Sequence, residues 1–266
     1  MIDSVTLTTE YRFPFGQPVL ARRLLITESR PYFVLGAYPS ALHIHWCPPY
    51  PYKPVKAIAV DNEPEIFWDG RNEQVIFNMW KKTMKFDPSR GNIEPAKRLN
   101  GSSGKWVDEY VLSLFKISRQ EAWLTDCLDT YRCSTGLAAR LKDTYEPLAL
   151  KCGWPTCNLL PHPDEDTIVS EALAYHRDRL NNELASAHPE LVVTLGNAAL
   201  RVFRELALEI PPEAPGKLSL LPGLYGSRIR VKLSTDRFID WLPLVHPATP
   251  QRYRQAHEIW VKSLVK

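Results

Sequence analysis

The sequence contains no apolar run near the roughly 18 residues that a membrane-spanning helix needs, so we expect no transmembrane span and no membrane partner. The first residues, MIDSVTLTTEYRF, carry acids early and lack an apolar core, so we expect no secretion signal. Five cysteines in 266 residues, with no close CxxC pair, do not form a disulfide framework. These absences predict a reduced, intracellular protein, which we place in the cytoplasm.

Neither sign of charge dominates, because the formal net charge is only +3. The isoelectric point of about 8.5 lies below the value of about 9 that is typical of a whole nucleic-acid-binding domain. A polyanionic partner would therefore need a local cluster of positive charge. We find no internal repeat, no low-complexity tract and no dividing linker, so residues 1–266 are expected to form a single domain and a monomer. Residues 100–104, Asn-Gly-Ser-Ser-Gly, predict an exposed basic loop.

Four short apolar runs are present, and they are continuous rather than alternating, as is typical of central strands buried on both faces. They lie at residues 32–35, 122–125, 191–195 and 241–245. Helical periodicity appears at residues 73–86, 107–117, 167–187, 197–208 and 250–264. Strands alternating with helices predict an α/β fold, a three-layer α/β/α sandwich with a central, mostly parallel four-stranded sheet. Residues 55–68 are expected to add an edge strand or a hairpin.

Small, polar or acidic residues follow each of the four predicted strands. They are Gly36-Ala37-Tyr38-Pro39-Ser40, Asp126-Cys127, Gly196-Asn197 and His246-Pro247. In open α/β sheets ligands bind outside the carboxyl ends of the strands. The four strand ends therefore predict a single cleft.

Two of these strand ends also predict helix starts. Asn197 is expected to cap a helix whose free N–H groups and positive dipole end face the cleft. Thr249 precedes a proline at the first helical position of another helix. Arg252 and Arg254 lie in its first turn, where a cation is poorly matched to the dipole unless an anion is bound. A phosphate would explain the two arginines, and the alternative is that both are solvated surface residues.

The order of these segments resembles the uracil-DNA glycosylase superfamily over nearly the whole chain, from Tyr32 to Arg254. The residues that carry the resemblance are the Gly-x-x-Pro-Ser loop, WLTDCLD, HPELVVTLGNAALRVF, LPLVHPATPQRYR and EPEIFWDG. The resemblance implies a monofunctional DNA glycosylase of base excision repair, which flips a damaged or deaminated base out of DNA. Such a hydrolase breaks the N-glycosidic bond of the flipped base, so damaged DNA is the implied partner.

The resemblance also implies roles for individual residues. His246-Pro247 stands where the family keeps a His-Pro-Ser motif, and its imidazole would stabilise the negative charge on the leaving base. The implied base-binding residues are Gly36, Ala37, Tyr38 and Trp68. The implied DNA-binding residues are Pro39, Ser40, Asn197, Thr249, Arg252 and Arg254.

One departure from the family pattern concerns the acid or amide of the first loop, whose position is taken by Tyr38. A phenol with a pKa near 10 is a poor general base at neutral pH. Asp126 is the replacement catalytic residue that we favour, and as an acceptor it suits a base edge that donates hydrogen bonds. Asp61 and Asp69 are further candidates, or ordinary turn residues. The alternative function is a glycosylase-like protein that binds DNA or a nucleobase without cleaving it.

Aromatic residues near the first loop matter because flipped bases are held by stacking, and we expect one of Trp46, Phe67 and Trp68 to stack. The His43-x-His45-x-Cys47 triplet and the Cys152-x4-Cys157 pair match no common zinc spacing. The early CxxC of the family's iron–sulfur branches is also missing, so we expect no metal and no cofactor. No Gly-x-Gly-x-x-Gly follows any strand, which disfavours a Rossmann-like nucleotide-binding enzyme.

Overall fold

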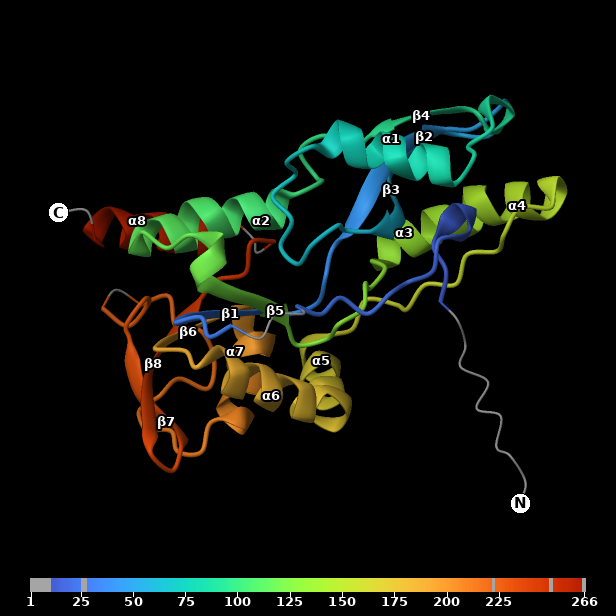
Figure 1. Cartoon of the computed structure of the whole chain (residues 1–266). Helices are drawn as coiled ribbons and strands as arrows, with labels where there is room; N and C mark the ends of the chain where they lie inside the picture. Colours follow the sequence, from blue (N-terminus) through green and yellow to red (C-terminus); the bar gives the residue numbers. More distant parts are fainter. Residues whose placement is uncertain (1–10, 25–27, 222, 249–250, 265–266) are drawn as a thin grey trace, which may run out of the picture.

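The computed structural model describes residues 11–24, 28–221, 223–248 and 251–264, and Figure 1 shows their arrangement. The strands are β1 (Tyr32–Gly36), β2 (Ala41–Cys47), β3 (Val55–Asn62), β4 (Asn92–Pro95), β5 (Ala122–Asp126), β6 (Leu191–Leu195), β7 (Ile229–Ser234) and β8 (Arg237–Leu244). The α-helices are α1 (Glu73–Thr83), α2 (Ser102–Val107), α3 (Thr135–Arg140), α4 (Glu146–Cys152), α5 (Glu165–Glu171), α6 (Arg177–Ala187), α7 (Gly196–Leu206) and α8 (Gln251–Leu264). Three π-helical segments continue helices: Asp108–Leu112, Leu141–Tyr145 and Ala172–His176. Short 3-10 turns lie at Pro14–Gly16, Pro88–Arg90, Ser113–Phe115 and Arg119–Glu121.

The larger sheet has the strand order β5-β1-β6-β8-β7, in which the first four strands are parallel and β7 is antiparallel to β8. The four parallel strands are the four apolar runs of the sequence. Every residue of β5 and β6 is buried, as expected for strands covered on both faces. The predicted α/β fold is confirmed, with five strands in this sheet instead of four. The extra strand, β7, is only partly buried because it forms the edge.

Helices cover both faces of this sheet, with α5, α6 and α7 on one side and α2 and α8 on the other (Figure 1). Alternate residues of β1 supply the two cores, because successive side chains of a strand point to opposite faces. Phe33 belongs to the core that contains Leu184 of α6, whereas Val34 belongs to a second core that contains Val107 of α2.

The smaller sheet is antiparallel, with the order β3-β2-β4, and it lies beyond the ends of the parallel strands (Figure 1). Residues 55–68 contribute β3, which pairs with β2 as a hairpin in this second sheet. Helices α1, α3 and α4 pack with it around a third core that contains Trp46 and Trp80. Since β2 begins only a few residues after β1 ends, the loop 37–40 joins the two sheets.

The prediction of an exposed loop at residues 100–104 is wrong. Asn100 is buried, and its amide donates to the carbonyl of His43 and accepts from the N–H of His43, both at 2.8 Å. Helix α2 begins at Ser102. A side chain at Gly104 would overlap the backbone of Phe67 and Trp68, so this glycine permits close packing and does not mark a flexible segment.

Among the described residues, no helix is both long enough and apolar enough to cross a bilayer.

Candidate functional site

A cavity of about 690 Å³ opens at the carboxyl ends of the parallel strands. The residues that line it from the strand ends are Ala37, Tyr38, Pro39, Ser40, Asp126, Leu195, Gly196, Asn197 and His246. The opposite wall comes from the second sheet and the segments around α3, and includes His43, Ala57, Glu63, Phe67, Tyr131, Arg132, Leu137, Arg140 and His162. The four strand ends therefore meet at one cavity, and the second sheet closes it.

His246 lies two residues beyond β8, where it is half-buried and lines the cavity. The N–H of Ala248 donates to its Nδ1 at 3.1 Å, so the ring proton resides on Nε2. Desolvation lowers the pKa of His246 to about 4, which keeps the ring neutral at physiological pH. Gly196, with φ +85°, allows the start of α7 to approach, because a side chain there would lie 3.1 Å from Cβ of His246. The imidazole is thus a fixed neutral donor.

Asp126 is the last residue of β5 and is almost fully buried. Burial raises the pKa of its carboxyl to about 7; nearby Glu183 raises it further, whereas Arg179 opposes the shift. Arg179 also donates to the backbone carbonyl of Asp126 at 2.8 Å and to that of Cys127 at 2.9 Å, which fixes the strand end. This carboxyl therefore changes its protonation state near neutral pH.

Gly36 lies directly against this carboxyl. A methyl group at Gly36 would overlap Oδ1 of Asp126 and lie 2.6 Å from Cζ of Phe67. Only glycine therefore permits the observed approach of the three segments. Gly36 supports the cavity from behind and does not line it.

Of the three aromatic residues considered for stacking, only Phe67 lines the cavity. Trp68 is buried in the core of the second sheet, where its indole N–H donates to the carbonyl of Arg71 at 3.1 Å. Trp46 is also buried in that core, and its indole N–H donates to Arg90. The aromatic residue in the cavity wall is thus Phe67, at φ +52°, and not the predicted Trp68.

Tyr38 lines the cavity, and its hydroxyl is 2.5 Å from Nδ1 of His162. Burial raises the pKa of Tyr38 to about 12, with the Asp126 carboxylate acting in the same direction. The phenol therefore stays protonated and does not act as a base at neutral pH.

Only some of the predicted DNA-binding residues line the cavity. Pro39, Ser40 and Asn197 line the cavity. Asn197 is not the helix cap, because α7 begins one residue earlier; its Oδ1 accepts from the N–H of Leu218 at 2.8 Å. Thr249 lies outside the described residues.

The two arginines of α8 are exposed, and neither lines the cavity. The guanidinium of Arg252 lies over the ring of Tyr253, 4.8 Å from its centroid. Arg254 donates to the carbonyl of Pro247 at 3.0 Å and so ties α8 to the turn that carries His246.

Asp61 and Asp69, the two further acid candidates, do not line the cavity. Asp69 accepts from the N–H of Arg71 at 2.9 Å, which is a turn interaction. Asp61 accepts from the N–H of Asn62 at 2.8 Å. Asp69 therefore has the turn role that was its alternative prediction, whereas Asp61 lies in β3 and not in a turn. In the part of the chain that the structure describes, no group of three or more His, Cys, Asp or Glu side chains is placed to hold a metal ion.

Glu63 is a cavity residue that the sequence analysis missed. It follows β3, is 4% exposed, and its Oε1 accepts from the N–H of Ser40 at 3.2 Å. Burial, together with the charge of Asp126, raises the pKa of Glu63 to about 8. The only signal in the sequence was its place at the start of EPEIFWDG, one of the motifs that carried the resemblance.

Comparison with known proteins identifies the family. The model of the Uracil DNA glycosylase superfamily matches residues 86–265, which is well over half of the chain. The match includes Asp126, Asn197 and His246, and it begins after the first loop and Glu63. No curated protein matches the chain.

Proposed function

The chain belongs to the uracil-DNA glycosylase superfamily, and we propose that it is a monofunctional DNA glycosylase that hydrolyses the N-glycosidic bond of a damaged or deaminated base. The observation that carries this proposal is the neutral imidazole of His246 in the wall of a cavity formed by four strand ends. Family membership supports a glycosylase-like function acting on DNA.

The cavity offers the groups that this reaction needs. The bond between C1′ and the base nitrogen breaks, and its electron pair leaves with the base while an oxocarbenium-like sugar forms. Nε2–H of His246 donates to the developing negative charge on the base, and this stabilises the transition state. Water then bonds to C1′ and gives a proton to a carboxylate. Asp126 lines the cavity, which supports the proposal that it contacts the base or this water.

The size and position of the cavity support a flipped nucleotide as its ligand. Volumes of about 300–1,000 Å³ are usual for small-molecule sites, and 690 Å³ holds a base together with its sugar. Because both sheets supply its walls, we propose that the whole chain acts as one glycosylase unit. Ser40 and Asn197 are proposed to contact the DNA backbone on the cavity side, and Arg252 and Arg254 to contact phosphates outside the cavity.

A base-release assay tests the proposal. Single-turnover reactions with duplexes and single strands that contain uracil, hypoxanthine, xanthine or an alkylated base should release at least one free base. His246→Ala should lower that rate by roughly 100-fold or more while DNA binding is retained. His188→Asn is the matched control, because this exposed histidine precedes β6 and so lies at the end of that strand opposite to the cavity. An unchanged rate in His246→Ala would remove the imidazole from the mechanism.

A second function, base or DNA binding without cleavage, is favoured by one observation: the protonated phenol of Tyr38 replaces the expected acid of the first loop. Binding of lesion duplexes with no base released from any of them would establish this function and exclude the glycosylase.

A further inference from the structure

The carboxyl group of Glu63 reaches the first loop from a different strand. Its Oε1 accepts from the N–H of Ser40, two residues after Tyr38, and the side chain lines the same cavity as Asp126 and His246. The first loop therefore has a carboxyl group at its side even though it does not contain one.

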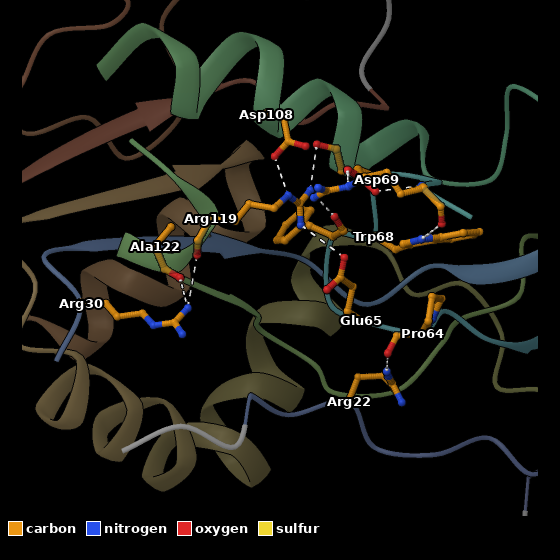
Figure 2. A network of polar contacts seen from close by, with 12 residues as sticks. Arg22, Arg30, Pro64, Glu65, Trp68, Asp69, Asp108, Arg119 and Ala122 are labelled. Atoms are coloured by element: carbon orange, nitrogen blue, oxygen red, sulfur yellow. Dashed lines mark hydrogen bonds and ion pairs between the residues drawn. The ribbon is translucent and has the colours of Figure 1, made fainter. Parts of the chain in front are cut away.

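The segment that carries Glu63 is held in place by several contacts (Figure 2). Arg119 donates to the carbonyl of Phe67 at 2.7 Å and to the carboxylate of Asp108 at 2.7 Å. Arg22 donates to the carbonyl of Pro64, the residue directly after Glu63. A glutamate on such a fixed segment has little freedom to leave the cavity wall.

Burying Glu63 is costly for the folded protein. A carboxyl group out of water needs an opposite charge or it takes up a proton. Here desolvation is the largest effect on its pKa, the Asp126 charge adds to it, and Arg22 offsets only part of it. Groups held in such an unfavourable state in a cleft are frequent at catalytic sites.

We propose that Glu63 is the general base that takes the proton from the attacking water, while Asp126 contacts the base. This inference rests on the proposed hydrolysis. In the step, the water oxygen forms a bond to C1′, one water proton passes to Glu63, and the base leaves with the electron pair of the broken bond. Ser40 positions the carboxylate through its backbone N–H.

The raised pKa of Glu63, about 8, gives the step a pH signature. Only the ionised carboxylate accepts a proton, so single-turnover excision should increase as the pH rises from 6 to about 8. Asp126, whose pKa is raised to about 7, titrates in the same range, so the profile of Glu63→Gln decides which of the two carboxyl groups produces this limb.

The test compares the wild-type chain with Glu63→Gln, whose amide oxygen can still accept from Ser40. The variant should lose roughly 100-fold or more in single-turnover excision and lose the increase between pH 6 and 8, with lesion-duplex binding retained. Glu63→Asp should keep the pH dependence at a lower rate. Glu65→Gln is the control on the same segment, because the side chain of Glu65 is exposed and its ion pair with Arg119 is long at 3.9 Å, so rate and profile should not change.

A binding measurement tests the same carboxylate without any cleavage. DNA with a cationic pyrrolidine in place of the abasic sugar mimics the charge of the oxocarbenium ion, and a neutral tetrahydrofuran site is its uncharged match. Wild type should prefer the cationic mimic, and Glu63→Gln should lose at least about 10-fold of that preference.

The outcomes separate the two proposals. A Glu63→Gln rate, pH profile and cation preference equal to those of wild type would overturn the role of Glu63 and leave the glycosylase proposal intact. A wild-type chain that releases no base from any duplex would overturn both.

Discussion

The hydroxyl of Tyr225 and Nδ1 of His257 form a buried hydrogen bond of 2.7 Å that ties α8 to the segment preceding β7. The phenol oxygen also accepts from the N–H of Val245 at 3.1 Å, so its own proton goes to His257. Nε2 of His257 then donates to the carbonyl of Tyr110 at 3.1 Å. Since Val245 directly precedes His246, this chain of bonds anchors the catalytic candidate.

Removal of the phenol oxygen should therefore destabilise the fold. Tyr225→Phe leaves the N–H of Val245 and Nδ1 of His257 buried without a partner, which costs roughly 1–3 kcal/mol of unfolding free energy. Equilibrium urea unfolding, or a decrease in Tm of roughly 2–4 °C per kcal/mol, measures the loss. Tyr253→Phe is the control, because that hydroxyl only accepts an exposed bond from Arg252. Equal stability of the two variants would show that the buried chain contributes nothing.

The parallel strands were predictable because strands buried on both faces consist of consecutive apolar residues. Leu191–Leu195 was predicted to the residue, and the run at 122–125 missed only Asp126, the polar last residue of β5. By contrast, the edge strand β7 mixes exposed and half-buried positions and gives no such run. The second sheet was also missed, apart from β3, since β2 and β3 contain register shifts that blur their pattern.

The site was predictable where it follows from strand ends, as for Asp126 and His246. The site was not predictable where tertiary contacts decide which side chain faces the cavity. Phe67 and Trp68 are adjacent aromatics, and only the backbone conformation at Phe67 determines which of them faces the cavity. Glu63 looks like any surface glutamate in the sequence, and only the tertiary structure shows that it is buried in the cavity wall with a bond to Ser40.

The carboxyl of Asp126 should make stability depend on pH. Its pKa increases from 3.8 to about 7 on folding, so between these values the folded chain holds a proton that the unfolded chain has lost. The stability that this difference in pKa contributes to the folded chain is fully present below about pH 4. It is lost as the pH rises through 7. Asp126→Asn should therefore be more stable than wild type by roughly 1–3 kcal/mol at pH 8, with a much smaller gain at pH 4.5.

Thermal unfolding at both pH values checks this prediction. Asp143→Asn, at an exposed position, is the control and should show no such difference. A gain for Asp126→Asn that is equal at pH 4.5 and pH 8 would mean that burial does not hold the carboxyl protonated.

Gly36 should be intolerant of even one methyl group. In Gly36→Ala, Cβ would overlap Oδ1 of Asp126 and press on the ring of Phe67. The end of β1 must then move away from both residues. Overpacking of this kind costs roughly 1–3 kcal/mol, and base release should fall by at least about 10-fold. Gly136→Ala is the matched control: a methyl there meets no atom within 4 Å, and alanine in helix α3 should stabilise slightly. Similar unfolding midpoints and activities for the two variants would contradict the close approach.

The arginines of α8 should contribute through charge if they contact phosphates. Each phosphate contact contributes about 0.9 to the slope of log K against log salt for duplex DNA, so Arg252→Gln should flatten that slope by about one. Arg254→Gln should do the same and in addition lower base release, because Arg254 holds the carbonyl of Pro247 beside His246. Lys262→Gln removes the same charge about 15 Å further along the helix and serves as control. If the slopes for Arg252→Gln and Arg254→Gln equal the slope for Lys262→Gln, neither arginine contacts a phosphate. Both would then be solvated surface residues.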